Sequence, residues 1–228
     1  MEMQNKIIND YKIYFLSIFP QWQEEPYDLI LKLVNLNDIN SIKFLVENAD
    51  QIFSTENYSL SSEDIIANYS NIIGRLNRVD LLNSDIELDY TEIVNGAIEG
   101  KNYNMFLYGF EKIEDELING EITQFIELAA ANQNLEVLKY LFDSHGDEFY
   151  GFEESLLYIA ISDNLTDTLR FLVEEGISSL DSLKHMASKG KFKNDKNLMN
   201  FIQSYSILGK RKTREEYMEI IPKRQRTM

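Results

Sequence analysis

The chain has 228 residues, 44% of them hydrophobic, which is enough for a sizeable core, and it contains no cysteine. The lack of cysteine excludes a disulfide framework, a thiolate zinc site and a thiol nucleophile. The formal net charge is −16, but the seven Lys/Arg and three Glu after Gly209 sum to +4, which leaves −20 on the preceding residues. An acidic body repels phosphate groups and suits a basic protein partner, although the same charge could serve only solubility.

The N-terminal residues predict one amphipathic helix. In residues 5–19, side chains at helical spacing give an apolar face made of Ile7, Ile8, Tyr11, Phe15 and Ile18. We expect residues 1–27 to form a capping helix over the exposed core of a first repeat. A helix lying on a membrane surface is the competing interpretation, and the acidic Asp10 argues against it.

Membrane insertion and secretion are not expected. The start of the chain lacks a basic segment followed by an apolar run, and no stretch approaches the roughly 18 apolar residues of a membrane span. We therefore expect an intracellular protein, cytoplasmic or nuclear, with no membrane partner.

One pattern recurs along residues 28–208. The segment "IELAAANQNLEVLKYLFDSHG" (126–146) aligns without a gap with "LYIAISDNLTDTLRFLVEEGI" (157–177), so that Ala129 matches Ala160 and Leu141 matches Leu172. Weaker copies are "LKLVNLNDINSIKFLVENAD", "TEIVNGAIEGKNYNMFLYGF" and "DSLKHMASKGKF", and the copy at 61–90 keeps the fewest positions. A period near 33 residues predicts stacked helix-turn-helix units, since neither helix could bury its apolar face alone.

Each copy is expected to open on a residue that can cap a helix. These residues are spaced by 33, 30, 33, 31 and 26 positions and are Asp28, Ser61, Thr91, Gln124, Ser155 and Asp181. The turn between the two helices is expected to need a positive φ. Glycine adopts that conformation freely and asparagine tolerates it, which points to Gly100, Gly190, Asn37 and Asn164.

The repeated pattern resembles the ankyrin repeat family. Leu128, Ala129 and Ala130, followed by "NLEVLKYL" (134–141), match its inner and outer helices, although no copy begins with the family's Thr-Pro-Leu-His. The degenerate, Asn- and Ile-rich copies are similar to those of ankyrin proteins from large DNA viruses. The resemblance implies an all-α, ankyrin-like solenoid of about six stacked repeats, with a concave surface that binds a protein.

The apparent catalytic and ligand-binding motifs lack the spacing or the residue types that their functions require. The segment "GAIEGK" (96–101) has three residues between its glycines where a phosphate loop has four, and Asn102 replaces the Ser or Thr, so we interpret both glycines as repeat positions. A calcium loop would need glycine where Glu148 stands. His145 and His185 lie in different copies. We predict a non-enzymatic protein with no catalytic residues, no metal site and no cofactor.

The segment "GDEFYGFEES" (146–155) is the best candidate for partner binding. It sets aromatic side chains among carboxylates, a combination typical of interface hot spots. We expect Phe152 to pack beneath the loop and Tyr150 and Tyr158 to be exposed. The predicted partner-binding residues are Phe149, Tyr150, Phe152, Glu154 and Tyr158.

Residues 209–228 are expected to form a flexible basic tail. Two clusters lie ten residues apart, the first made of Lys210, Arg211 and Lys212 and the second of Lys223, Arg224 and Arg226. They resemble a bipartite nuclear import signal, which would make an import receptor a partner. The alternative is a solvated tail that touches phosphates, so nucleic acid is expected only here.

These features predict a protein–protein interaction module that binds a host or cellular protein through the concave face of the array. A viral protein that binds a host protein is its most concrete form. The alternative is a structural component of a viral particle or larger assembly, in which the tail touches nucleic acid. A monomer with a saturable partner favours the module, whereas self-association or salt-sensitive DNA binding favours the structural component.

Overall fold

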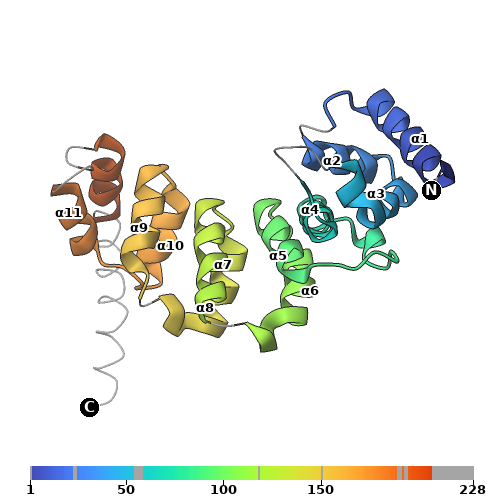
Figure 1. The fold of residues 1–228 in the computed structure, drawn as a ribbon. Helices are drawn as coiled ribbons and strands as arrows, with labels where there is room; N and C mark the ends of the chain where they lie inside the picture. The colour runs from blue at the N-terminus through green and yellow to red at the C-terminus, as the bar shows by residue number, and fades with distance from the viewer. Residues whose placement is uncertain are drawn as a thin grey trace, which may run out of the picture. The chain divides into compact units, whose positions relative to one another are not determined.

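The computed structural model describes residues 2–22, 25–53, 59–117, 119–149, 151–188, 192 and 195–206. Within these ranges all regular elements are helices and no residue belongs to a strand (Figure 1). The chain divides into two compact units, Met1–Glu121 and Ile122–Met228. None of the described helices combines the length and apolar character needed to cross a membrane.

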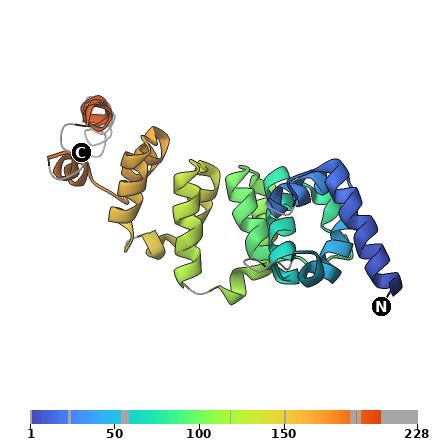
Figure 2. The same cartoon turned by 45° about the horizontal axis from the view of Figure 1, so that its top comes forward.

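The first unit contains six α-helices in the described residues. They are α1 (Glu2–Ile18), α2 (Pro26–Asn35), α3 (Ile39–Ile52), α4 (Ser62–Leu76), α5 (Tyr90–Glu99) and α6 (Tyr103–Ile113). Helices α2 and α3 form one hairpin and α5 and α6 form another, and α4 packs against α2, α3 and α5. Helix α5 packs against both α4 and α6, and the three helices can be followed by colour in Figure 2.

The second unit continues the series of hairpins. Helix α7 (Asn119–Ala131) lies mostly in this unit and is followed by α8 (Leu135–Phe149), α9 (Glu153–Ser162), α10 (Thr166–Glu174) and α11 (Leu180–Ser188). Residues 196–206 form a further helix. Helix α10 packs against both α9 and α8.

Five turns in the described part of the chain share one backbone geometry. In each turn the amide of the residue that follows the left-handed residue donates to a carbonyl five residues earlier, as Asp38 N does to Leu33 O (2.9 Å) and Leu165 N to Ala160 O (2.7 Å). This is the Schellman arrangement, which needs one left-handed residue. That residue has φ between 52° and 57° and is Asn37, Asn77, Lys101, Gln133 or Asn164.

Two of the predicted turn residues are confirmed and one is wrong. Asn37 and Asn164 have positive φ as expected. Gly100 has φ −78°, and Lys101 after it takes the left-handed conformation. Gly190 lies outside the described residues.

Gly100 is required because the position has no room for a side chain, and not because of its φ angle. A Cβ there would collide with the carbonyl oxygen of Arg75, and the same test finds backbone collisions at Gly74 and Gly96. Helices α4 and α5 therefore approach backbone against backbone through these three glycines. The interpretation of both glycines of "GAIEGK" as structural positions agrees with this packing.

Side-chain donors link neighbouring hairpins at one equivalent carbonyl, three residues before the left-handed residue. Arg78 Nη1 donates to Val34 O (2.8 Å). Asn102 Nδ2 donates to Gly74 O (3.0 Å), and Thr168 Oγ1 donates to Ala130 O (3.1 Å). Equivalent hydrogen bonds thus occur twice in the first unit and once in the second among the described residues, and each links two neighbouring hairpins.

The predicted opening residues are mostly wrong as caps. Ser61 alone among the six is an N-cap: its Oγ accepts from Asp64 N (3.2 Å), and the Asp64 carboxylate accepts from Ser61 N (2.8 Å). The other helices begin earlier because other residues start them, such as Pro26 at the first position of α2 and Asp89 as the cap of α5. The residues that lie inside helices instead are Asp28, Thr91, Gln124, Ser155 and Asp181.

The second copy keeps its first helix and loses its second. Helix α4 ends in the shared turn at Asn77, but a short 3-10 helix, η1 (Val79–Leu81), follows where the other copies have an outer helix. The weak sequence match of residues 61–90 thus corresponds to a half-formed hairpin.

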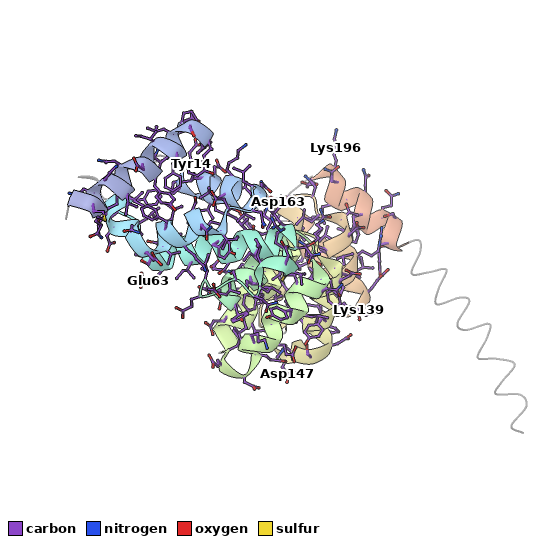
Figure 3. All side chains as sticks on the ribbon, turned by 90° about the vertical axis from the view of Figure 1, so that its right-hand side faces the viewer. Tyr14, Glu63, Lys139, Asp147, Asp163 and Lys196 are labelled. Carbon is purple, nitrogen blue, oxygen red and sulfur yellow. The ribbon has the colours of Figure 1, made fainter. Side chains whose placement is uncertain are left out.

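Helix α1 covers the aromatic core of the first hairpin. Phe15 is completely buried beside Trp22, with ring centroids 5.6 Å apart, and Tyr11 stacks on Phe44 of α3 at 3.7 Å. Tyr14, labelled in Figure 3, donates to Asp38 Oδ2 (2.8 Å). Of the predicted apolar face Ile7 is wrong, because its side chain is 44% exposed.

Candidate functional site

The structure separates the five predicted partner-binding residues. Phe149 is completely buried and lies edge-on to Phe142 at 5.3 Å, so its assignment as a partner contact is wrong. Phe152 was expected beneath the loop and is instead 37% exposed at the N-cap of α9. The reason is that α8 continues past a kink at His145 and turns Phe149 into the core. Tyr150 lies outside the described residues.

Glu154 and Tyr158 line an exposed groove between α9 and α11. The groove has a volume of about 930 Å³ and is floored by the segment that joins α10 to α11. Helix α9 contributes Glu153, Glu154, Leu157 and Tyr158, and α11 contributes Asp181, Ser182, His185 and Met186. Both walls come from the first helices of consecutive hairpins.

Tyr158 is the main exposed aromatic of the groove. It follows Glu154 by one helical turn, so both side chains lie on one face of α9. The ring of Tyr158 is 48% exposed and lies edge-on to the buried Phe192, with centroids 5.5 Å apart. A tyrosine held from behind in this way presents the exposed part of its ring to a partner at low entropic cost.

The rim of the groove is acidic. Glu153 and Glu154 occupy the first turn of α9, where the helix dipole favours negative charge, and neither forms an ion pair with any residue in the described part of the chain. Asp181 Oδ1 accepts from Lys184 Nζ (2.8 Å), and this hydrogen bond lowers the pKa of Asp181. Two carboxylates therefore remain to attract a cationic group.

The floor of the groove is shaped by Gly176 to Ser179. Gly176 has φ 73°, a conformation that favours glycine, and turns the chain from α10 into the groove. Ile177 is buried, and Ser178 N donates to Leu172 O (2.9 Å). The Oγ of Ser178 is buried and has no hydrogen-bond partner within the described ranges.

The chemistry of this groove suits binding of a polypeptide segment. Leu157, Ile177 and Met186 supply apolar contacts, and Glu153 and Glu154 supply negative charge. In the residues that the structure describes, no group of three or more His, Asp or Glu is placed to hold a metal ion.

Sequence reasoning missed the α11 side of the groove. No motif in the sequence includes Ser182, His185 or Met186. The prediction was based instead on the aromatic residues of segment 146–155. A signal was present in the repeat itself. If consecutive first helices lie side by side, the helix near Asp181 must flank Glu154 and Tyr158.

The predicted import or nucleic-acid residues are not placed by the structure. They lie outside the described residues and are Lys210, Arg211, Lys212, Lys223, Arg224 and Arg226. Their assignment stays a prediction from the sequence.

Comparisons with protein-family models, with curated proteins and with solved structures find no match for this chain. The ankyrin resemblance therefore rests on the sequence pattern alone. The candidate site rests on the geometry of the groove between α9 and α11.

Proposed function

We propose that this chain is a non-enzymatic protein-interaction module that binds a partner protein through the groove between α9 and α11. The observation that carries the proposal is the exposed Tyr158 beside Glu154, which has no ion pair among the described residues, in a groove whose apolar lining is Leu157, Ile177 and Met186. Exposed tyrosines at the centre of a concave surface are frequent binding hot spots. The matching occupant is a segment with apolar side chains next to Lys or Arg.

The further proposal is that the hairpins form an ankyrin-like array whose partner is a host or cellular protein. The shared turn geometry and the recurring hydrogen bond between hairpins support stacked repeats. In such arrays the first helices of consecutive copies form the binding surface, which is where this groove lies.

Affinity capture from cell lysate, followed by mass spectrometry, tests the proposal. The baits are the full chain, Tyr158→Ala, Glu154→Lys and the matched control Asp163→Lys. Asp163, labelled in Figure 3, is exposed at the opposite end of α9 and lies outside the groove. Asp163→Lys therefore changes the net charge of the protein by the same amount as Glu154→Lys but leaves the groove unaltered. Circular dichroism checks each fold, because a lysine in the first turn of α9 costs about 0.3–1 kcal/mol.

The expected result is a protein that the full chain and Asp163→Lys retain and that Tyr158→Ala and Glu154→Lys lose. Titration of the purified partner should then give saturable binding to a monomer. Equal recovery by all four baits would refute the groove as the site. Self-association of the chain, or recovery of nucleic acid alone in a salt-sensitive manner, would favour the structural-component alternative.

A further inference from the structure

The C-terminal segment of this chain has the composition that the groove requires. Residues 210–228 contain seven Lys/Arg and three Glu, for a net charge of +4, against −20 for residues 1–209. Between its two basic clusters lie the three Glu of the segment and "YMEII" (217–221), in which four apolar residues surround Glu219. The net positive charge of the segment matches the carboxylates of Glu153 and Glu154, and its apolar side chains match Leu157, Ile177 and Met186 of the lining.

The segment also begins within reach of the groove. The last described helix, residues 196–206, is held at its start by Asn197 Nδ2, which donates to Asn164 Oδ1 (2.8 Å). Near its end, Tyr205 lines one pocket with Thr166 and Arg170 of α10, the helix that ends at Glu174. Two residues after Glu174 the chain enters the groove at Gly176.

Chain length is not a constraint. From residue 206 to residue 217 an extended chain spans up to about 36 Å, which is longer than α9 or α10 at about 1.5 Å per residue. Residues 217–221 can therefore reach the groove within one molecule.

We propose that residues 210–228 dock in the groove of the same chain, with the apolar side chains of 217–221 against Leu157, Ile177 and Met186 and the Lys/Arg of the segment beside Glu153 and Glu154. This inference rests on the proposed function, because it assigns an internal competitor to the same groove. A tethered segment acts at an effective concentration of about millimolar, so even weak docking fills the site. If the segment occupies the groove nine-tenths of the time, the apparent Kd of an outside partner rises about tenfold.

Disulfide trapping in the full chain tests the docking. The sequence contains no cysteine, so a pair of introduced cysteines gives one unambiguous bond. The test pair is Ser182→Cys with Met218→Cys, because Ser182 lines the groove and serine is close to cysteine in size. The control pair is Asn200→Cys with Met218→Cys, because Asn200 is exposed on the 196–206 helix, outside the groove and nearer to the segment in sequence.

Docking predicts that the test pair forms an intramolecular disulfide about tenfold faster than the control pair, measured on non-reducing gels and by mass spectrometry of the linked peptides. Adding Glu153→Lys and Glu154→Lys should remove the difference. Raising the salt to about 1 M should reduce it, since the screening length falls to about 3 Å. His185→Cys in place of Ser182→Cys provides a second groove position if the first variant does not fold.

Equal rates for the two pairs would overturn the inference, as would a bond that forms only between two molecules and so assigns the groove to a second copy. The proposed function is judged separately by partner capture. If capture depends on Glu154 and trapping fails, the groove binds a partner and the internal competitor is wrong. If trapping succeeds and no variant captures a partner, the docking stands and the proposed function falls.

Discussion

Substitution of Gly96 tests whether the close approach of α4 and α5 holds the first unit together. A Cβ on Gly96 would collide with the carbonyl oxygen of Asn71 and would lie 2.8 Å from its carbonyl carbon and 2.9 Å from Arg75 N. Backbone atoms cannot rotate away as a side chain does, so the two helices must separate. Alanine favours an α-helix over glycine by about 0.5–1 kcal/mol, but overpacking costs about 1–3 kcal/mol, and separation also loosens the contacts at Gly74 and Gly100. We expect Gly96→Ala to lower the free energy of unfolding by about 2 kcal/mol.

Denaturant unfolding followed by the fluorescence of Trp22 measures this loss. Trp22 is the single tryptophan, is 1% exposed, and lies 5.6 Å from the ring centroids of Phe15 and Phe53, so it reports on the first unit. Gly109→Ala is the graded control, because its Cβ would meet methyl groups of Val94 (3.0 Å) and Ile93 (3.2 Å) before any backbone atom. We expect that variant to change stability by less than about 1 kcal/mol, since a side chain can adjust. A Gly96→Ala protein as stable as Gly109→Ala would refute the packing argument.

Three further changes probe other parts of the fold. Asn102→Ala removes the hydrogen bonds from Nδ2 to Gly74 O and Arg75 O, and the Trp22 signal should show a loss of about 1–2 kcal/mol. Ser178→Ala removes a buried hydroxyl that has no partner in the described residues, so thermal unfolding followed by circular dichroism should show unchanged or higher stability, and a clear loss would reveal a partner. Burial raises the pKa of Tyr69 above 10.0, so the unfolded chain ionises first and the free energy of unfolding should fall as the pH rises through that value. Tyr69→Phe should flatten this fall in urea titrations across the alkaline range.

The repeat was predictable because it depends on short-range patterns. Alternating clusters of apolar residues predict pairs of helices, and the matched positions Ala129, Ala160, Leu141 and Leu172 are buried as the alignment requires. The all-helical composition of the described residues follows from the same periodicity.

The local chemistry at helix ends was less predictable, because neighbouring hairpins decide it. We predicted that Gly100 is the left-handed residue of its turn. The position needs glycine because a Cβ would collide with the Arg75 carbonyl oxygen, and Lys101 is the residue with positive φ. Lysine adopts that conformation only at some cost, so propensity alone points to the wrong residue. The collision with Arg75 is a contact between hairpins and leaves no mark in the local sequence.

Only the part of the candidate site that depends on local helix geometry was predicted from the sequence. Glu154 and Tyr158 are four residues apart on one helix, so their shared face follows from the sequence. The burial of Phe149 and the exposure of Phe152 depend on where α8 ends and how the kink at His145 turns it, which composition does not determine.

Where the first helices of two consecutive hairpins face each other, the size of the facing side chains decides whether the helices touch or leave a groove between them. Between α4 and α5 the facing positions are glycines, and the backbones meet with no room for a Cβ. Between α9 and α11 the facing positions carry Tyr158 and Met186, and a groove of about 930 Å³ remains. Tyr158→Ala should therefore cost less than about 1 kcal/mol in stability, because the ring is 48% exposed, yet it should abolish partner binding. Thermal unfolding and partner titration of that one variant would separate a residue kept for binding from one kept for folding, and a large loss of stability would place Tyr158 in the second group.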